Sequence, residues 1–118
     1  MSKPTPAEIN ANLANFYGSE TFTRYTNSIL TDGAKYVAEA CGAFWLLDII
    51  CSVQLIAKVK REEFQVFSLV VKGQSATVTV TDGNDHVIYT QEIPYTDFPL
   101  PKIDLWRVNG TIMLPSEY

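Results

Sequence analysis

Hydrophobic residues follow helical spacing in the first part of the chain and strand-like alternation in the second. Ile9, Leu13 and Phe16 lie three or four positions apart, just after Thr5-Pro6-Ala7-Glu8, which has the form of a helix capping box. This arrangement predicts a short amphipathic helix over residues 6–17.

Two further helices are predicted downstream. Thr31-Asp32-Gly33 resembles a helix start, where an acidic residue is favoured by the positive end of the helix dipole, and Gly42 would end or bend that helix. Residues 43–56 are apolar on nearly every side, with Asp48 and Ser52 as the only polar stripe. A helix of this kind is normally buried, so we expect it to lie across a sheet.

Alternation in the second half predicts a hairpin. Gly73-Gln74 suits a two-residue turn with glycine in the first position. The resulting register pairs apolar residues on one face of the hairpin: Val71 with Ala76, Leu69 with Val78 and Phe67 with Val80. A slip by one residue would mix the two faces, so we expect this register.

Two more turn signals extend the predicted sheet. A turn with Gly83-Asn84 at its tip predicts a third strand that ends near Ile93-Pro94 and pairs Val80 with Val87 and Val78 with Tyr89. Asn109-Gly110 is typical of a type I′ turn, and it would join residues 105–108 to a short strand over residues 111–114.

These elements predict an α+β fold. We expect a single domain over residues 1–118, with two to three N-terminal helices packed on one face of a four- to five-stranded antiparallel sheet. Residues 19–27, rich in threonine and aromatic residues, are either a loop or a short edge strand.

Charge and composition narrow the possible partners. The 118 residues include 9 basic and 13 acidic side chains, and the net charge is −4. Because binding to nucleic acid or to anionic lipid depends on basic side chains, we expect neither a nucleic-acid nor a membrane partner.

The same data predict a cytoplasmic protein. Residues 1–6 contain one lysine with no apolar segment behind them, so we expect no signal peptide. The longest apolar stretch, residues 43–57, is too short and too interrupted to span a bilayer. Cys41 and Cys51 would lie about 15 Å apart along a continuous helix, so we expect two reduced, buried thiols.

Few residues are suited to catalysis. The one histidine, His86, lies beside a predicted turn, and no metal-binding spacing, phosphate loop or dinucleotide motif occurs. We therefore expect no metal and no cofactor. A nucleophilic cysteine–histidine pair would have to combine His86 with Cys41 or Cys51, both in buried-looking helix.

Carboxylates are the remaining catalytic candidates. Asp48 interrupts an apolar helix, so it lies either at the rim of the core or in a pocket with a raised pKa. An acid/base enzyme would require Asp48 to converge with Asp32 and Asp97 on one pocket.

The candidate binding residues are Trp45, Glu117 and Tyr118. Trp45 precedes Asp48 by three positions, where a tryptophan is more often part of the core than a ligand platform. The segment over residues 114–118 ends on Tyr118, and it could dock on its own core or serve as a peptide-like ligand for another protein.

Several motifs together resemble a known family. In order they are Gly18-Ser19-Glu20, Leu30-Thr31-Asp32-Gly33, Gly42-Ala43-Phe44-Trp45-Leu46-Leu47-Asp48, Phe64-Gln65-Val66-Phe67, Tyr95-Thr96-Asp97-Phe98-Pro99-Leu100 and Leu114-Pro115-Ser116-Glu117-Tyr118. Over about residues 16–118 the chain resembles a family of small uncharacterised proteins of bacteria and phages, a domain of unknown function. The resemblance implies a soluble single-domain protein and assigns no catalytic residues.

Elimination leaves binding as the expected function. The segment over residues 64–71 is apolar on both strand faces, and extra apolar surface on a sheet commonly marks an interface. We therefore expect a protein-binding module, as a homodimer or with another protein. The alternatives are a carboxylate-dependent acid/base enzyme and an acidic inhibitor that mimics nucleic acid.

Overall fold

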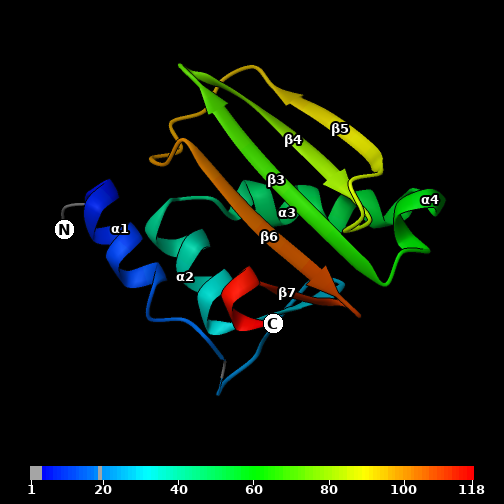
Figure 1. The fold of residues 1–118 in the computed structure, drawn as a ribbon, viewed down its shortest axis with the longest axis horizontal. Helices are drawn as coiled ribbons and strands as arrows, with labels where there is room; N and C mark the ends of the chain where they lie inside the picture. Colours follow the sequence, from blue (N-terminus) through cyan, green and yellow to red (C-terminus); the bar gives the residue numbers. More distant parts are fainter. Residues whose placement is uncertain (1–3, 19) are drawn as a thin grey trace.

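A computed structural model describes residues 4–18 and 20–118, and in it helices lie behind a long twisted sheet (Figure 1). The helices are α1 (Pro6–Leu13), α2 (Asp32–Ala40), α3 (Phe44–Ser52) and α4 (Ala57–Lys60), with 3-10 turns η1 (Val53–Leu55) and η2 (Pro115–Glu117). The strands are β1 (Thr23–Tyr25), β2 (Ser28–Leu30), β3 (Phe64–Lys72), β4 (Ser75–Thr81), β5 (Val87–Ile93), β6 (Lys102–Val108) and β7 (Thr111–Met113).

The fold is α+β, as predicted, but the sheet is larger than expected. Seven strands occur in the order β1-β2-β7-β6-β3-β4-β5, and β2 pairs with β7 in parallel. The prediction of four to five antiparallel strands was therefore wrong in number and in one pairing. β1 and β2 have three residues each, too few for alternation to be visible in the sequence.

The central hairpin has the predicted register. Val71 pairs with Ala76, Leu69 with Val78 and Phe67 with Val80. The Asn109-Gly110 turn is also confirmed, because both residues have positive φ, as a type I′ turn requires, and Val108 pairs with Thr111 across them.

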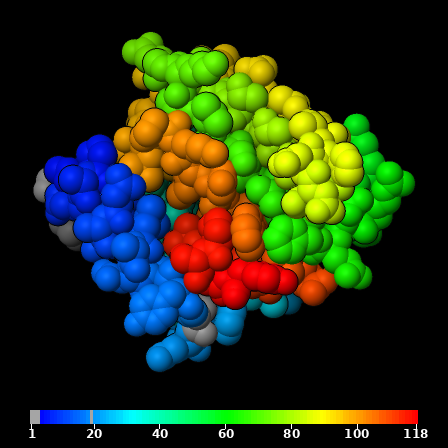
Figure 2. Space-filling model, viewed as in Figure 1, coloured from blue at the N-terminus to red at the C-terminus, as the bar shows by residue number. Residues whose placement is uncertain are grey.

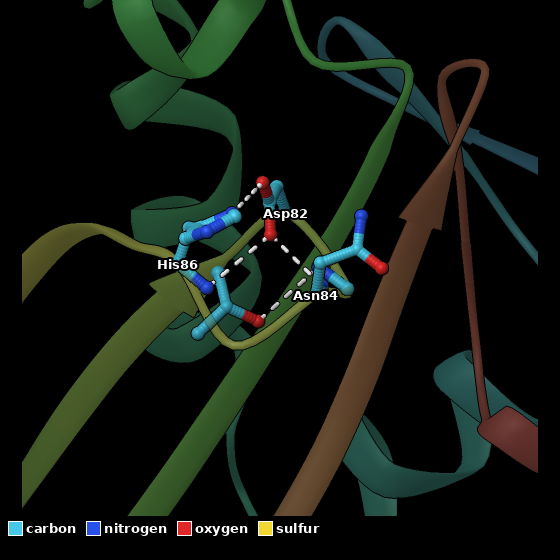
Figure 3. A network of polar contacts seen from close by, with 5 residues as sticks. Asp82, Asn84 and His86 are labelled. Atoms are coloured by element: carbon cyan, nitrogen blue, oxygen red, sulfur yellow. Dashed lines mark hydrogen bonds and ion pairs between the residues drawn. The ribbon is translucent and has the colours of Figure 1, made fainter.

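The predicted register of β5 was wrong by two residues. Val80 pairs with Tyr89 rather than with Val87, and the ladder is irregular between Val80 and Thr81. The cause is the loop that joins β4 to β5 (Figure 3). The Asp82 carboxylate accepts hydrogen bonds from the backbone N–H groups of Asn84 and His86, which stabilises a wider loop than a two-residue turn.

Two helices are shorter than predicted. α1 begins with the expected capping box but ends at Leu13, in a stretch rich in asparagine, which competes for backbone hydrogen bonds. The long central helix predicted over residues 43–56 ends at Ser52, whose hydroxyl bonds to the Ile49 carbonyl three residues back. η1 and α4 then turn the chain, and Val59 of α4 is fully buried.

The core lies between the helices and one face of the sheet. α2 and α3 lie behind the strands, while α1 lies to the side of α2 rather than behind the central strands (Figure 1). Asn12 of α1 donates a hydrogen bond to the Tyr36 hydroxyl of α2. The buried apolar residues on the strands are Leu30, Phe67, Leu69, Ala76, Val78, Val80, Ile103, Leu105 and Ile112. On the opposite sheet face, Figure 1 shows the short η2 turn (red) in front of the lower end of the sheet, whereas α1 to α4 do not lie in front of the strands.

Candidate functional site

The three predicted acids occupy three different settings. Asp32 is the first residue of α2 and accepts a hydrogen bond from the Thr21 hydroxyl, whereas Asp48 lies on the exposed side of α3. Asp97 is exposed in the connection between β5 and β6. Across residues 4–18 and 20–118, no three acidic, histidine or cysteine side chains gather where they could hold a metal ion.

Asp48 connects α3 to the edge of the sheet. Its carboxylate accepts a hydrogen bond from the hydroxyl of Tyr25 on β1. That bond, followed by burial and the nearby charge of Asp48, raises the Tyr25 pKa to about 12. Asp48 thus holds a tyrosine in its neutral form at the rim of the core.

Trp45 packs against the β5–β6 connection. Its ring meets Phe98 edge-on with centroids 6.5 Å apart, and it is partly buried against the core. The adjacent Thr96 hydroxyl accepts a hydrogen bond from the Phe98 N–H. Trp45 is therefore a packing residue in this structure.

Glu117 caps α2 from the opposite end of the chain. Its carboxylate accepts hydrogen bonds from the Thr31 hydroxyl (2.6 Å), the Gly33 N–H (3.0 Å) and its own neighbour Leu114 N–H (2.9 Å). A carboxylate is favoured there because the helix N-terminus has unpaired N–H groups and a positive dipole end. Residues 114–118 therefore dock on their own fold.

Tyr118 packs on the face of the sheet opposite α2 and α3. Its ring meets Phe64 of β3 and Trp106 of β6, with centroids 5.6 and 5.5 Å away, and those two rings are 4.9 Å apart. Gly83 of the β4–β5 loop closes over Phe64, where a Cβ would lie 2.9 Å from the ring. Figure 2 shows this face, with the C-terminal residues (red) between the N-terminal residues (blue) and the β4–β5 loop (yellow).

We call the sheet face opposite α2 and α3 the open face, formed by β7, β6, β3 and β4. Its apolar side chains are only partly buried and do not belong to the core packing; they are Phe64, Val66, Val70, Trp106, Val108 and Met113. The strand pairing places Trp106 between Met113 and Val66 in one continuous row. The apolar second face expected for residues 64–71 is therefore present.

A polar row crosses the middle of the open face. Cross-strand pairing aligns Asp104, Ser68, Thr79 and Thr90 over four strands. One Asp104 oxygen, Oδ1, is shielded from solvent and accepts no hydrogen bond from the described residues. Such an oxygen is energetically costly, so this position favours an added hydrogen-bond donor.

A second polar cluster lies on the covered side of the sheet. Arg107 of β6 donates hydrogen bonds to Ser28 Oγ (3.0 Å), Gln54 Oε1 (3.2 Å) and the Asn27 carbonyl (3.2 Å). Gln54 and the fully buried Gln65 exchange amide hydrogen bonds of 2.7 and 3.0 Å. Burial lowers the Arg107 pKa.

The sequence predictions missed this cluster although a signal was present. Gln65 shares its strand face with Phe67 and Leu69, and Arg107 shares its face with Leu105. Polar residues at core-facing strand positions are uncommon unless they are hydrogen-bonded. The break in alternation at residues 65 and 107 therefore marked a buried polar network.

The remaining candidates are isolated from one another. Cys41 and Cys51 are both free and buried, and burial raises the Cys41 pKa to about 11. The His86 ring lies 2.9 Å from the Asp82 carboxylate within the β4–β5 loop (Figure 3). No helix in the described part of the chain is long and apolar enough to cross a membrane.

Comparison with known proteins identifies a family for the chain. Residues 7–118 match DUF6876, described as a family of unknown function. The chain belongs to DUF6876. This confirms the expected membership in a domain family of unknown function, and the DUF6876 match also takes in α1 from residue 7, which lies outside the motifs quoted above. No curated protein and no solved structure matches the chain.

Proposed function

We propose that this DUF6876 protein is a protein-binding module that self-associates through the open face of its sheet. The observation that carries the proposal is the row of half-buried apolar and aromatic side chains across β7, β6 and β3, which α1 to α4 leave uncovered and on which Tyr118 of the C-terminal segment packs. Contiguous apolar surface on a soluble protein commonly marks a protein interface. Aromatic residues such as Trp106 are enriched in such interfaces.

Charges on the open face favour a second copy of the chain as the occupant. Lys102 and Asp104 lie two residues apart on the same side of β6. In a twofold pair with antiparallel β6 strands, Lys102 of each copy faces Asp104 of the other, because a symmetric interface is self-complementary. The lysine would also supply the hydrogen-bond donor that Asp104 Oδ1 lacks.

The side of the molecule that carries the open face is broad enough for a stable dimer interface. The molecule measures 40 × 35 Å across its two longer axes, which corresponds to an elliptical outline of about 1,100 Å². A standard interface buries about 800 Å² on each partner. The open face lies on this broad side, beside the N-terminal residues (blue) and the C-terminal residues (red), in the view along the shortest axis in Figure 2.

Sedimentation equilibrium at micromolar to high micromolar concentration tests the proposal. We expect the wild-type chain to be dimeric at the upper end of that range. Val70→Lys places a charge on the open face at a residue that is already 38% exposed, so the fold should tolerate it while the dimer dissociates.

The matched control is Tyr95→Lys, which adds the same charge at a 70% exposed aromatic residue outside the open face. This variant should remain dimeric. A wild-type chain that stays monomeric at high micromolar concentration would refute self-association, as would equal dimer stability in the two variants.

A further inference from the structure

A cavity of about 440 Å³ adjoins Arg107, on the side of the sheet away from the open face. Its walls come from the β1–β2 turn, η1, the segment after α4 and the β6–β7 turn. The lining residues are Asn27, Gln54, Leu55, Lys60, Glu62, Glu63, Arg107, Asn109 and Gly110. This volume lies in the range of small-molecule sites in proteins.

Arg107 lines the cavity and carries a positive charge that has no anionic partner among the described residues. Its three hydrogen bonds go to neutral oxygens, on Ser28, Gln54 and Asn27. The two ion pairs among the described residues, Lys35–Glu39 and Asp82–His86, do not involve it. A partly buried cation with no counter-charge favours binding of an anion.

The bonds that Arg107 already makes leave donors for a ligand. A guanidinium has five N–H groups, one on Nε and two on each terminal nitrogen. The single N–H of Nε donates to Ser28, and each terminal nitrogen donates one N–H, to Gln54 or to the Asn27 carbonyl. One N–H therefore remains on each terminal nitrogen, enough for two hydrogen bonds to a carboxylate.

The other charges of the cavity limit which anion fits. Lys60 adds a second positive charge, but Glu62 and Glu63 also line the cavity. Neither glutamate takes part in an ion pair within the described residues. Two carboxylates would repel a multiply charged anion and would attract an ammonium group on the same ligand.

The wall that bears these charges is held in place. Gln65 donates from Nε2 to the carbonyls of Val59 and Glu62, each at 2.9 Å, and pairs with Gln54 behind Arg107. The segment after α4 is thereby tied to β3, so the positive and negative groups keep their relative positions. Preorganised polar groups of this kind favour ligand binding.

We infer that this cavity binds a small zwitterion, an α-amino acid with an apolar side chain. Arg107 would hold the carboxylate, Glu62 and Glu63 would attract the ammonium group, and Leu55, which is 90% exposed, would contact the apolar side chain. This inference is independent of self-association, because none of these residues lies on the open face.

Titration of the ¹⁵N-labelled protein with L-leucine, followed by amide chemical shifts, tests the inference. We expect saturable shifts at Asn27, Asn109 and the segment over residues 60–63. Two analogues separate the charges: 4-methylpentanoic acid lacks the ammonium group and 3-methylbutylamine lacks the carboxylate. Each should bind at least about tenfold more weakly than L-leucine, which corresponds to 1.4 kcal/mol or more.

Variants test which residue binds the carboxylate of the ligand and which residue attracts its ammonium group. Arg107→Lys should weaken the binding of L-leucine more than that of 3-methylbutylamine, because a lysine cannot make the paired hydrogen bonds of a guanidinium group. Glu63→Gln should weaken the binding of L-leucine but not that of 4-methylpentanoic acid. Because Glu63 is exposed, this variant stays informative if Arg107→Lys fails to fold. Glu92→Gln on β5 is the matched control and should change nothing.

Two results would overturn the inference. One is the absence of saturable shifts with L-leucine, L-valine and L-phenylalanine. The other is equal binding of L-leucine and either analogue, which would leave Arg107 as a purely structural link between β2, η1 and β6.

Discussion

At the scale of single residues, polar side chains join elements that the sequence separates. Tyr25 and Asp48 link β1 to α3, and Gln54 and Gln65 link η1 to β3. The Gln54–Gln65 pair is buried, where a hydrogen bond is shielded from competing water, whereas the Tyr25–Asp48 bond lies at the exposed rim of the core. Side-chain chemistry thus fixes how the helical layer sits on the sheet.

The Tyr25–Asp48 bond predicts an alkaline loss of stability. The folded-state pKa of Tyr25, about 12, exceeds the ordinary tyrosine value of about 10. The stabilisation is therefore complete below pH about 10 and is lost as the pH rises from there through about 12. Tyr25→Phe should lower the free energy of unfolding by about 1 kcal/mol at neutral pH and reduce its fall above pH about 10.

Urea unfolding of wild type and Tyr25→Phe, measured at neutral pH and near pH 11, checks this prediction. Tyr95→Phe at an exposed site is the control and should track the wild type. A difference between wild type and Tyr25→Phe that is the same at both pH values would show that tyrosine ionisation is not coupled to folding.

At the scale of elements, α2 depends on the C-terminal segment for its first turn. Thr31 provides the ordinary N-cap by accepting the Ala34 N–H, and Glu117 accepts the Gly33 N–H from outside the helix. Gly33 has no side chain because that space is filled. A Cβ there would lie 2.6 Å from the Leu114 side chain and would also collide with Glu117.

Gly33→Ala should therefore displace η2 and destabilise the protein by about 1–3 kcal/mol, the usual cost of overpacking. Glu117→Ala should cost a similar amount, about 1–3 kcal/mol, because N–H groups lose their acceptor. The double variant should be less destabilised than the sum of the two, since removal of the Glu117 side chain makes room for the new methyl group.

Denaturant unfolding of the two single variants and the double variant measures this coupling. Gly18→Ala is the control, because a Cβ at that glycine would meet nothing within 4 Å. Strict additivity of Gly33→Ala and Glu117→Ala would contradict the proposed contact.

At the scale of the whole molecule, the two sheet faces have different roles. The covered face and α1, α2, α3 and α4 share one core, which also contains both cysteines. The open face keeps its aromatic and apolar residues at the surface and supports the proposed self-association. The reactivity of the two cysteine thiols therefore measures the accessibility of the core and not of the open face.

Burial of the cysteines predicts slow thiol labelling in the folded protein. Cys41 is 5% exposed, and burial raises its pKa to about 11, so little reactive thiolate is present at pH about 8. In Cys51→Ala, which isolates Cys41, labelling by a disulfide reagent should be slow without urea. It should accelerate in proportion to the unfolded fraction as urea is added.

A glutathione thiol at the same pH provides the reference rate. Labelling of folded Cys51→Ala at that rate would show that Cys41 is accessible and that the core does not shield it.

Local signals in the sequence determined two of the hairpins and the starts of two helices. Turn residues at Gly73-Gln74 and Asn109-Gly110, together with alternation, specified two strand registers, and capping residues specified where α1 and α2 begin. These features depend on neighbours within a few residues, so sequence alone can define them. Predictions of helix length and strand register were wrong where a side chain hydrogen-bonds to the nearby backbone, as at Ser52 and Asp82.

Only the tertiary structure decided the contacts between distant segments. The parallel pairing of β2 with β7, the capping of α2 by Glu117 and the network of Arg107, Gln54 and Gln65 join residues far apart in the chain. The sequence showed that residues 65 and 107 were polar on a core face, but it could not show which acceptors they meet. Their partners are set by how the whole core packs, because a buried polar group is stable only where folding brings a partner to it.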